Sequence, residues 1–159
     1  MRMRRKKNLE ERLNSVSDYL LISDFEDRNF NTAKDKKEYI DVDNWFGRKA
    51  PLYLEIGCGK GKFACEYAMQ NPDINLIAVE KSGNVIVEGC ETAKRECISN
   101  LRFIKCGAEY LEKYLKDKSV DRIFLNFSCP FPKKAYANHR LTAQRFLKIY
   151  DRMEIAAGQ

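Results

Sequence analysis

From Leu52 onward, short apolar runs alternate with amphipathic stretches, and this alternation most restricts how the chain can fold. It predicts strands over residues 52–56, 75–80, 101–106 and 120–127, and helices over residues 62–70, 83–97, 108–116 and 141–155. Strands and helices that alternate in this way form a parallel sheet with helices on both faces. We therefore expect an α/β protein whose ligand binds in the loops beyond the carboxyl ends of the strands.

The first fifty residues have a different character. Four apolar residues fit one helical face: Leu9, Leu13, Val16 and Leu20. Residues 23–43 are rich in Asp and Asn, which predicts a loop or an extended arm. The alternation of strands and helices begins only after Ala50-Pro51. We therefore expect a basic, partly helical lead-in over residues 1–50 and the main domain over residues 51–159.

The composition is that of one soluble globular domain, with 33% charged and 44% hydrophobic residues among 159. No run approaches the ~20 apolar residues of a membrane helix, and the basic start leads into no apolar signal-peptide core. We expect a cytoplasmic protein that does not contact a membrane. The six cysteines form no CxxC pair, which argues against a zinc ribbon or a redox dithiol, so no bound metal is expected.

The net charge of +6 is unevenly distributed. Lys and Arg outnumber Asp and Glu by 12 to 10 over residues 1–50 and by 6 to 2 over residues 126–159, and the counts are 11 and 11 between them. A neutral middle with basic ends fits a polyanion held against a neutral fold. A solvated surface that keeps the protein soluble explains the charge equally well.

The first loop, residues 55–61, reads E-I-G-C-G-K-G. Dinucleotide-binding loops of the form G-x-G-x-x-G need the third glycine one position later than Gly61. The spacing of Gly57, Gly59 and Gly61, with Glu55 two positions before the first, instead resembles the cofactor loop of S-adenosylmethionine-dependent methyltransferases. That cofactor has no phosphate, but its ammonium and sulfonium groups make a carboxylate such as Glu55 a suitable neighbour.

Two further loops carry residues suited to the same ligand. Glu80 ends the second predicted strand, 19 residues after Gly61. A carboxylate at this place accepts hydrogen bonds from ribose hydroxyls in nucleotide-binding folds, whereas a lone acid at a strand end is common on any surface. Together with the glycine loop, Glu80 is predicted to contact the ribose. Gly107-Ala108, in the third loop, is small enough for an adenine ring to lie against the backbone.

The fourth loop, residues 126–134, reads N-F-S-C-P-F-P-K-K and is followed by H-R-L-T at residues 139–142. This pattern closely resembles the signature of the tRNA (guanine-N7-)-methyltransferase family, in which the usual run is N-F-S-D-P-W-P-K-K followed by R-R-L-T. The glycine loop and the run N-P-D-I-N at residues 71–75 are also similar to the family, as is the basic start. The resemblance covers nearly the whole chain.

The resemblance implies a Rossmann-like class I methyltransferase fold, S-adenosylmethionine as cofactor and tRNA as partner. It implies cofactor contacts for six residues: Glu55, Gly57, Glu80, Gly59, Gly107 and Ala108. It implies RNA contacts for four more: Lys133, Lys134, His139 and Arg140. Under this reading residues 51–159 are the amino-terminal part of the methyltransferase domain.

The chain departs from the family in several places. Cys129 stands where the family has an acid after N-F-S, Phe131 replaces its tryptophan, and Gly107 aligns with the usual acid of the third loop. Cys129 is therefore the residue at the catalytic position, although a small side chain without a chemical role explains it better. The family continues past a K-T-D-N motif that this chain lacks. We therefore expect a sheet truncated after the fourth predicted strand and its helix, with residues 120–127 at an open edge.

The function that the resemblance implies is methyl transfer to N7 of a guanine in tRNA. Guanine N7 carries a lone pair and no proton, so the reaction needs positioning rather than a general base. Two alternatives remain open at this point. One is a remnant of the family that binds RNA or cofactor with little or no turnover, and the other is a methyltransferase acting on a small molecule.

Overall fold

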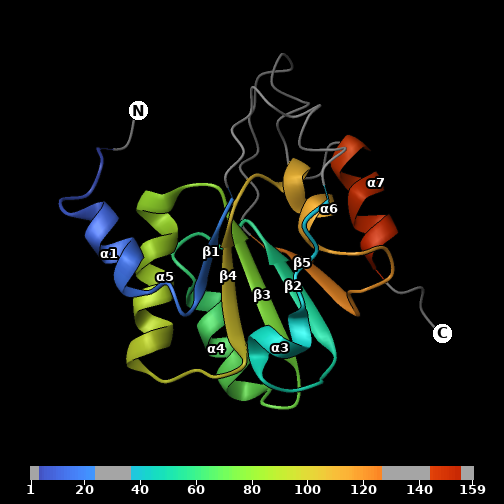
Figure 1. The fold of residues 1–159 in the computed structure, drawn as a ribbon, viewed down its shortest axis with the longest axis horizontal. Coiled ribbons are helices and arrows are strands. Elements are labelled where there is room, and N and C mark those ends of the chain that lie inside the picture. The colour runs from blue at the N-terminus through green and yellow to red at the C-terminus, as the bar shows by residue number, and fades with distance from the viewer. Residues whose placement is uncertain (1–3, 24–36, 127–143, 155–159) are drawn as a thin grey trace.

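The computed structural model describes residues 4–23, 37–126 and 144–154 and contains a parallel sheet of five strands (Figure 1). The strand order is β1-β4-β3-β2-β5. The strands are β1 (Leu20–Ile22), β2 (Leu52–Ile56), β3 (Asn75–Glu80), β4 (Leu101–Lys105) and β5 (Arg122–Leu125). All four pairings are parallel, so the carboxyl ends of all five strands lie at the same end of the sheet.

Helices cover both faces of this sheet (Figure 1). Those packed on one face are α4 (Lys62–Gln70) and α5 (Gly83–Arg95), with α1 (Leu9–Ser15) against α5. Those on the other face are α3 (Val42–Phe46), the 3-10 helix η2 (Ala108–Tyr110), α6 (Leu111–Tyr114) and α7 (Gln144–Met153). We call these the α4–α5 face and the α6–α7 face. No described helix is long and apolar enough to cross a lipid bilayer.

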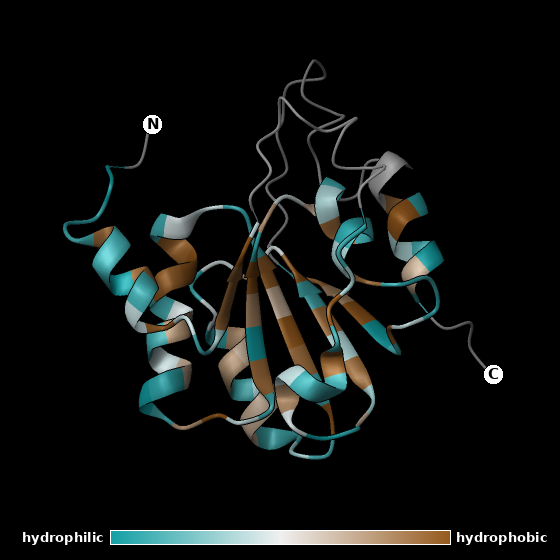
Figure 2. Cartoon of the chain, viewed as in Figure 1, coloured by the Kyte–Doolittle hydropathy of each residue, from teal (hydrophilic) through white to brown (hydrophobic). Residues whose placement is uncertain are grey.

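Successive side chains of the central strand enter opposite cores. In β3, Leu76 and Ala78 pack on the α4–α5 face, whereas Ile77 and Val79 pack on the α6–α7 face. All four are buried, which explains why the middle of the sheet is an almost continuous apolar run in sequence (Figure 2). The α/β fold predicted from the sequence is confirmed.

The predicted bounds of β2, α4 and β3 match the structure to the residue. One expectation for the first fifty residues is wrong. The first helix ends at Ser15, and Leu20 starts β1, where it pairs with Phe103. The helix α3 begins at Val42, at the end of the expected loop or arm, and the Asp41 side chain caps it by accepting a hydrogen bond from the Asn44 N–H at 3.2 Å. The sheet therefore includes a strand from the lead-in, which a three-residue run is too short to reveal.

The strand β5 lies at the edge of the described sheet, as expected for residues 120–127. Its side chains Ile123, Phe124 and Leu125 are half-buried. On its outer side the Ile123 N–H donates to Glu154 Oε2 at 3.1 Å, and Val120 forms a parallel bridge with Glu154. The residue after α7 therefore lies alongside the start of this edge strand.

The basic start of the chain packs against α5 over its described part. Lys6 Nζ lies 2.8 Å from Glu88 Oε2, and the Lys6 N–H donates to Asn84 Oδ1 at 2.6 Å. Arg12 donates two hydrogen bonds to the carboxylate of Glu91. Lys6 and Arg12 are therefore engaged in ion pairs, which leaves less of the basic charge at the start of the chain for a polyanion.

The loop before α4 crosses α5 at two glycines. A Cβ on Gly61 would lie 2.8 Å from the Gly89 Cα and 3.4 Å from the ring of Phe103. Gly61 also has a φ of +79°, which residues with a Cβ rarely adopt. This contact holds the loop after β2 directly against α5.

Replacing Gly61 tests this close approach, with Gly47 as the matched control. Gly47 has a similar φ of +72° but nothing within 4 Å of the Cβ position. Gly47→Ala should lower the free energy of unfolding by about 1–2 kcal/mol through backbone strain alone. Gly61→Ala should lower it by about 1–3 kcal/mol more, because the Cβ meets backbone atoms that have no room to shift. Equal losses in urea denaturation would show that the crossing is not tight.

Candidate functional site

The carboxyl ends of β2, β3 and β4 bring the predicted cofactor residues together. Glu55 is paired in register with Ala78, and Glu80 lies two residues beyond Ala78 on the same strand. Glu80 is paired with Lys105, and Gly107 lies two residues beyond Lys105. From each strand to the next, the position of interest therefore lies two residues closer to the carboxyl end than the residue paired with the previous one.

These positions also share one face of the sheet. Ala78 belongs to the core of the α4–α5 face, so Glu55 and Glu80 project on that side. Cys106 packs on the α6–α7 face, so a side chain on the following extended residue, Gly107, would again be on the α4–α5 face. Strands about 4.8 Å apart and a two-residue advance of about 6.6 Å separate successive positions by about 8 Å.

The glycine loop between β2 and α4 is folded back toward β3. The N–H groups of Gly57 and Cys58 both donate to the carbonyl of Val79, at 2.8 and 2.9 Å. Gly57 and Gly59 have φ values of +77° and +57°. A Cβ on Gly59 would meet nothing within 4 Å, so the backbone is open on that side. The loop thus offers bare backbone beside the ends of β2 and β3.

Glu55 is fully buried, and its carboxylate oxygens make no hydrogen bond of normal geometry to a described residue, although the side chain of Asn126 is a polar neighbour. Burial raises the pKa of Glu55 to about 7, and the side chain of Asn126 beside it lowers this pKa in part. Removing an ionised carboxylate from water without a partner costs several kcal/mol, so such a group is rare in a purely structural role. Glu55 is therefore suited to meet a cationic group of a ligand.

Glu80 is half-buried at the end of β3, where Oε2 accepts a hydrogen bond from the Ser82 N–H at 2.8 Å. This bond fixes the carboxylate across the start of α5. Burial raises the pKa of the Cys58 thiol well above its usual range, with Glu55 and Glu80 adding to the effect. Both acids therefore lie close to Cys58 in the glycine loop.

In the third loop, Ala108 is buried and Gly107 is half-buried. The carboxylate of Glu109 folds back over Gly107, and its two oxygens lie 2.6 and 2.7 Å from where a Gly107 Cβ would be. Sequence reasoning did not single out Glu109. We call Glu55, Glu80 and Glu109 together the acidic diagonal.

The remaining predicted site residues lie outside the described part of the chain. They are the residue at the catalytic position, Cys129, and the predicted RNA contacts Lys133, Lys134, His139 and Arg140. Asn126, the last described residue of the fourth loop, is exposed. Within the described ranges no group of three His, Cys, Asp or Glu side chains could hold a metal ion.

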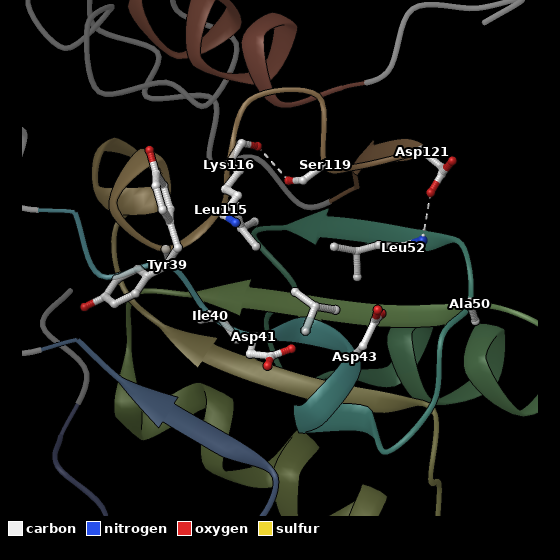
Figure 3. A pocket seen from close by; sticks show the side chains of 12 residues that line it. Tyr39, Ile40, Asp41, Asp43, Ala50, Leu52, Leu115, Lys116, Ser119 and Asp121 are labelled. Atoms are coloured by element: carbon white, nitrogen blue, oxygen red, sulfur yellow. Dashed lines mark hydrogen bonds between the residues drawn. The ribbon is translucent and has the colours of Figure 1, made fainter.

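A hollow of about 510 Å³ lies at the opposite end of the sheet (Figure 3). It is lined by Ala50 and Leu52 at the start of β2, by Ser119 and Asp121 before β5, and by residues 39–43. Asp121 Oδ2 accepts a hydrogen bond from the Leu52 N–H at 2.9 Å, so this carboxylate links the residue before β5 to the start of β2. Because the hollow is at the amino ends of the strands, it is separate from the glycine loop and the acidic diagonal.

Comparison with known proteins agrees with this geometry. A family model described as "Putative methyltransferase" matches residues 49–158. A protein of Macrococcus caseolyticus named tRNA (guanine-N(7)-)-methyltransferase is 41% identical over 116 residues, which are 73% of this chain and 54% of that protein. A protein of Brevibacillus brevis with the same name is 40% identical over 119 residues, or 73% and 56% of the two chains. The chain spans about half the length of the curated relatives it matches.

Among solved structures, the antibiotic-resistance methyltransferase Kmr is similar in fold. The TM-score is 0.56 at 20% sequence identity, over 74% of this chain and 60% of that one. This similarity supports the methyltransferase fold that the sequence predicted.

The buried carboxylate makes stability depend on pH in a specific direction. The folded-state pKa of Glu55, about 7, is above the unfolded value near 4.5, so the folded protein binds more protons between these values. Stability contributed by protonated Glu55 is present below pH 4.5 and is lost as the pH rises to about 7. The Glu55→Gln variant has no titrating group at this position. Its free energy of unfolding should therefore rise relative to that of the unchanged protein by up to about 3 kcal/mol across this pH window. Urea denaturation of both proteins from about pH 4.5 to 8 measures this difference in the free energy of unfolding. A difference that stays constant with pH would contradict the prediction.

Proposed function

This chain belongs to the methyltransferase family that matches residues 49–158, and we propose that it methylates N7 of a guanine in tRNA. The proposed methyl donor is S-adenosylmethionine, and the proposed compartment is the cytoplasm. The observation that carries the proposal is the buried carboxylate of Glu55, which has no charged partner among the described residues and lies close to Cys58 in the glycine loop. The proposed substrate rests on the two relatives described above, because both are named for this activity and are about 40% identical to this chain.

The described residues fit the proposed cofactor. Glu55 is a carboxylate without a charged partner among them, and S-adenosylmethionine has an ammonium and a sulfonium group that would compensate its charge. Glu80 lies about 8 Å farther along the acidic diagonal, at the place where nucleotide-binding folds hold a ribose. The glycine loop offers backbone where the ligand must approach closely.

Residues of this chain would act mainly by positioning. When bound, the cofactor supplies a methyl group on a positively charged sulfur. Guanine N7 presents an in-plane lone pair without a proton, so the chain needs no general base for this acceptor. Its contribution is to hold the two reactants in line, which is consistent with a site built on fixed strand ends. The exposed Asn126 begins the loop that would carry the acceptor base.

The basic loop proposed for the RNA consists of Lys133, Lys134, His139 and Arg140. Lys and Arg side chains contact phosphates without reading sequence, and each contact releases a counterion from the nucleic acid. The excess of 6 Lys and Arg over 2 Asp and Glu within residues 126–159 supports this assignment.

Methyl transfer into tRNA tests the function directly. Radiolabelled S-adenosylmethionine, unmodified tRNA and this chain should yield label in 7-methylguanosine after digestion to nucleosides. Glu80→Ala should weaken binding of S-adenosylhomocysteine by about 1–3 kcal/mol, because ribose hydroxyls lose their acceptor. The matched control Glu66→Ala, on the exposed side of α4, should leave binding unchanged.

Three outcomes separate the possible functions. Label in another nucleoside would contradict guanine N7 methylation and indicate a different position on the RNA. No label in RNA despite RNA binding would favour the remnant that binds without turnover. Methyl transfer to small molecules without RNA binding would indicate a different substrate class.

The salt dependence of tRNA binding tests the basic loop. Replacing Lys133 and Lys134 by Gln should weaken binding and reduce the slope of log K against log salt by roughly 0.7–0.9 for each lost phosphate contact. Filter binding between about 50 and 200 mM salt gives the slope. An unchanged slope would show that these lysines do not contact the backbone of the RNA.

A further inference from the structure

The polar residue that follows β5 continues the arrangement of the predicted cofactor residues on the other side of Glu55. Glu55 is paired in register with Phe124, and Asn126 lies two residues beyond Phe124. In the same way, Glu80 lies two residues beyond Ala78, the partner of Glu55 on β3. Glu55 is therefore flanked at the carboxyl end of the sheet by an acid on one side and an amide on the other.

Aromatic packing fixes the face and the position of β5 at this point. The ring of Phe124 lies edge-on to two rings of α4, with centroid distances of 5.4 Å to Phe63 and 5.1 Å to Tyr67. Phe124 therefore projects on the α4–α5 face, which is also the face of Glu55. Because residues two apart in an extended segment share a face, Asn126 is directed to the same side. The Cα atoms of Asn126 and Glu55 are about 8 Å apart, a gap that their two side chains span together.

The side chains of Asn126 and Glu55 join an exposed amide to a buried acid. Glu55 is fully buried, whereas Asn126 is exposed. Burial opposes the charged form of the carboxylate, and the amide of Asn126 beside it favours that form. Glu55 has no charged partner among the described residues. Asn126 is therefore the described neighbour that helps Glu55 to stay ionised.

An asparagine suits this place better than a charged or an apolar residue. Its amide has two N–H donors, and an ionised carboxylate accepts hydrogen bonds through both oxygens. A lysine here would neutralise Glu55 and compete with a cationic ligand. An apolar side chain would leave the buried acid to take up a proton. The amide does neither, because it supports the charge without cancelling it.

Resting on the proposed function, we infer that Asn126 is a positioning residue whose amide donates to one oxygen of Glu55 and leaves the other oxygen for the cationic group of the ligand. Asn126 acts through Glu55 and does not itself need to touch the ligand. Its hydrogen bond stabilises the ionised carboxylate that a cation requires, and it fixes the direction of that carboxylate. Loss of the amide should therefore matter most at a pH where Glu55 is partly protonated.

The other groups around Glu55 do not obscure this pH dependence. Among the described residues, those that carry charge or titrate are Glu80 at the end of β3, Cys58 in the glycine loop and Cys65 on α4. Burial raises the pKa of Cys65 to about 11 and the pKa of Cys58 well above its usual range. Neither thiol therefore ionises below about pH 8.5. Glu80 is kept in every variant described below, so a shift of the pH profile reports on Glu55.

Calorimetric titration of S-adenosylhomocysteine between about pH 5.5 and 8.5 tests this role without turnover. The ligand keeps its ammonium in this range. The affinity of the unchanged protein should rise with pH and level off above the pKa of Glu55, about 7. Asn126→Leu has nearly the same size but no donor, so its profile should move to higher pH by about one unit. This shift means about tenfold weaker binding near pH 6, and less than about threefold weaker binding near pH 8.5.

Three further variants separate this role from a general effect on the fold. Asn44→Leu replaces another exposed asparagine, on α3, and should leave the profile unchanged. Asn126→Gln keeps the amide and should bind more tightly than Asn126→Leu near about pH 6. In the Glu55→Gln background, adding Asn126→Leu should change the affinity by less than about twofold, because the carboxylate through which Asn126 acts is gone.

The outcomes distinguish this inference from the proposed function. If the unchanged protein does not bind S-adenosylhomocysteine, the proposed cofactor and this inference are both wrong. If it binds, and Asn126→Leu weakens binding equally at every pH or not at all, Asn126 does not act through Glu55 and only this inference is overturned. A loss of the same size in the Glu55→Gln background would overturn it as well. Because Asn126 is exposed, the variants should fold like the unchanged protein, which thermal unfolding checks.

Discussion

The parallel register of β2, β3 and β4 is the constraint on which the site depends. Because neighbouring strands run in the same direction, their ends and loops meet at one edge, and residues of like parity share a face. A shift of one residue in either pairing would move Glu55 or Glu80 to the opposite face. Burial on both faces holds the register, since Ile77 and Ala78 each fill a different core.

The site is partly in conflict with the stability of the fold. Glu55 lies at a buried position where an apolar side chain would have no desolvation penalty, and burial raises the pKa of Glu55 to about 7. The glycine loop adds backbone in the left-handed region, held by hydrogen bonds to Val79 and by the crossing of Gly61 over Gly89. A cationic ligand would offset the buried charge, so binding and folding are expected to be coupled at this edge.

Much of the candidate site was proposed from the sequence because its residues carry strong local signals. Glu55 and the glycines follow an apolar run that can only be a buried strand, and Glu80 ends the next one. Glu109 was missed because it lies inside a helical turn, where an acid is unremarkable in sequence. Leu20 was assigned to a helix because a three-residue strand has no period of its own. The predicted catalytic and RNA-contacting residues, from Cys129 to Arg140, stay predictions, because they lie outside the described residues.

The sequence by itself determined the order of strands and helices from Leu52 onward, the glycine loop and the methyltransferase family, because each is encoded in spacing between neighbouring residues. Tertiary structure decided which side chains meet. It added β1 to the sheet, folded Lys6 and Arg12 onto α5, and laid the carboxylate of Glu109 over Gly107. The physical reason is that strand register and the path of a turn arise from packing between segments far apart in the chain, and local periodicity does not report such packing.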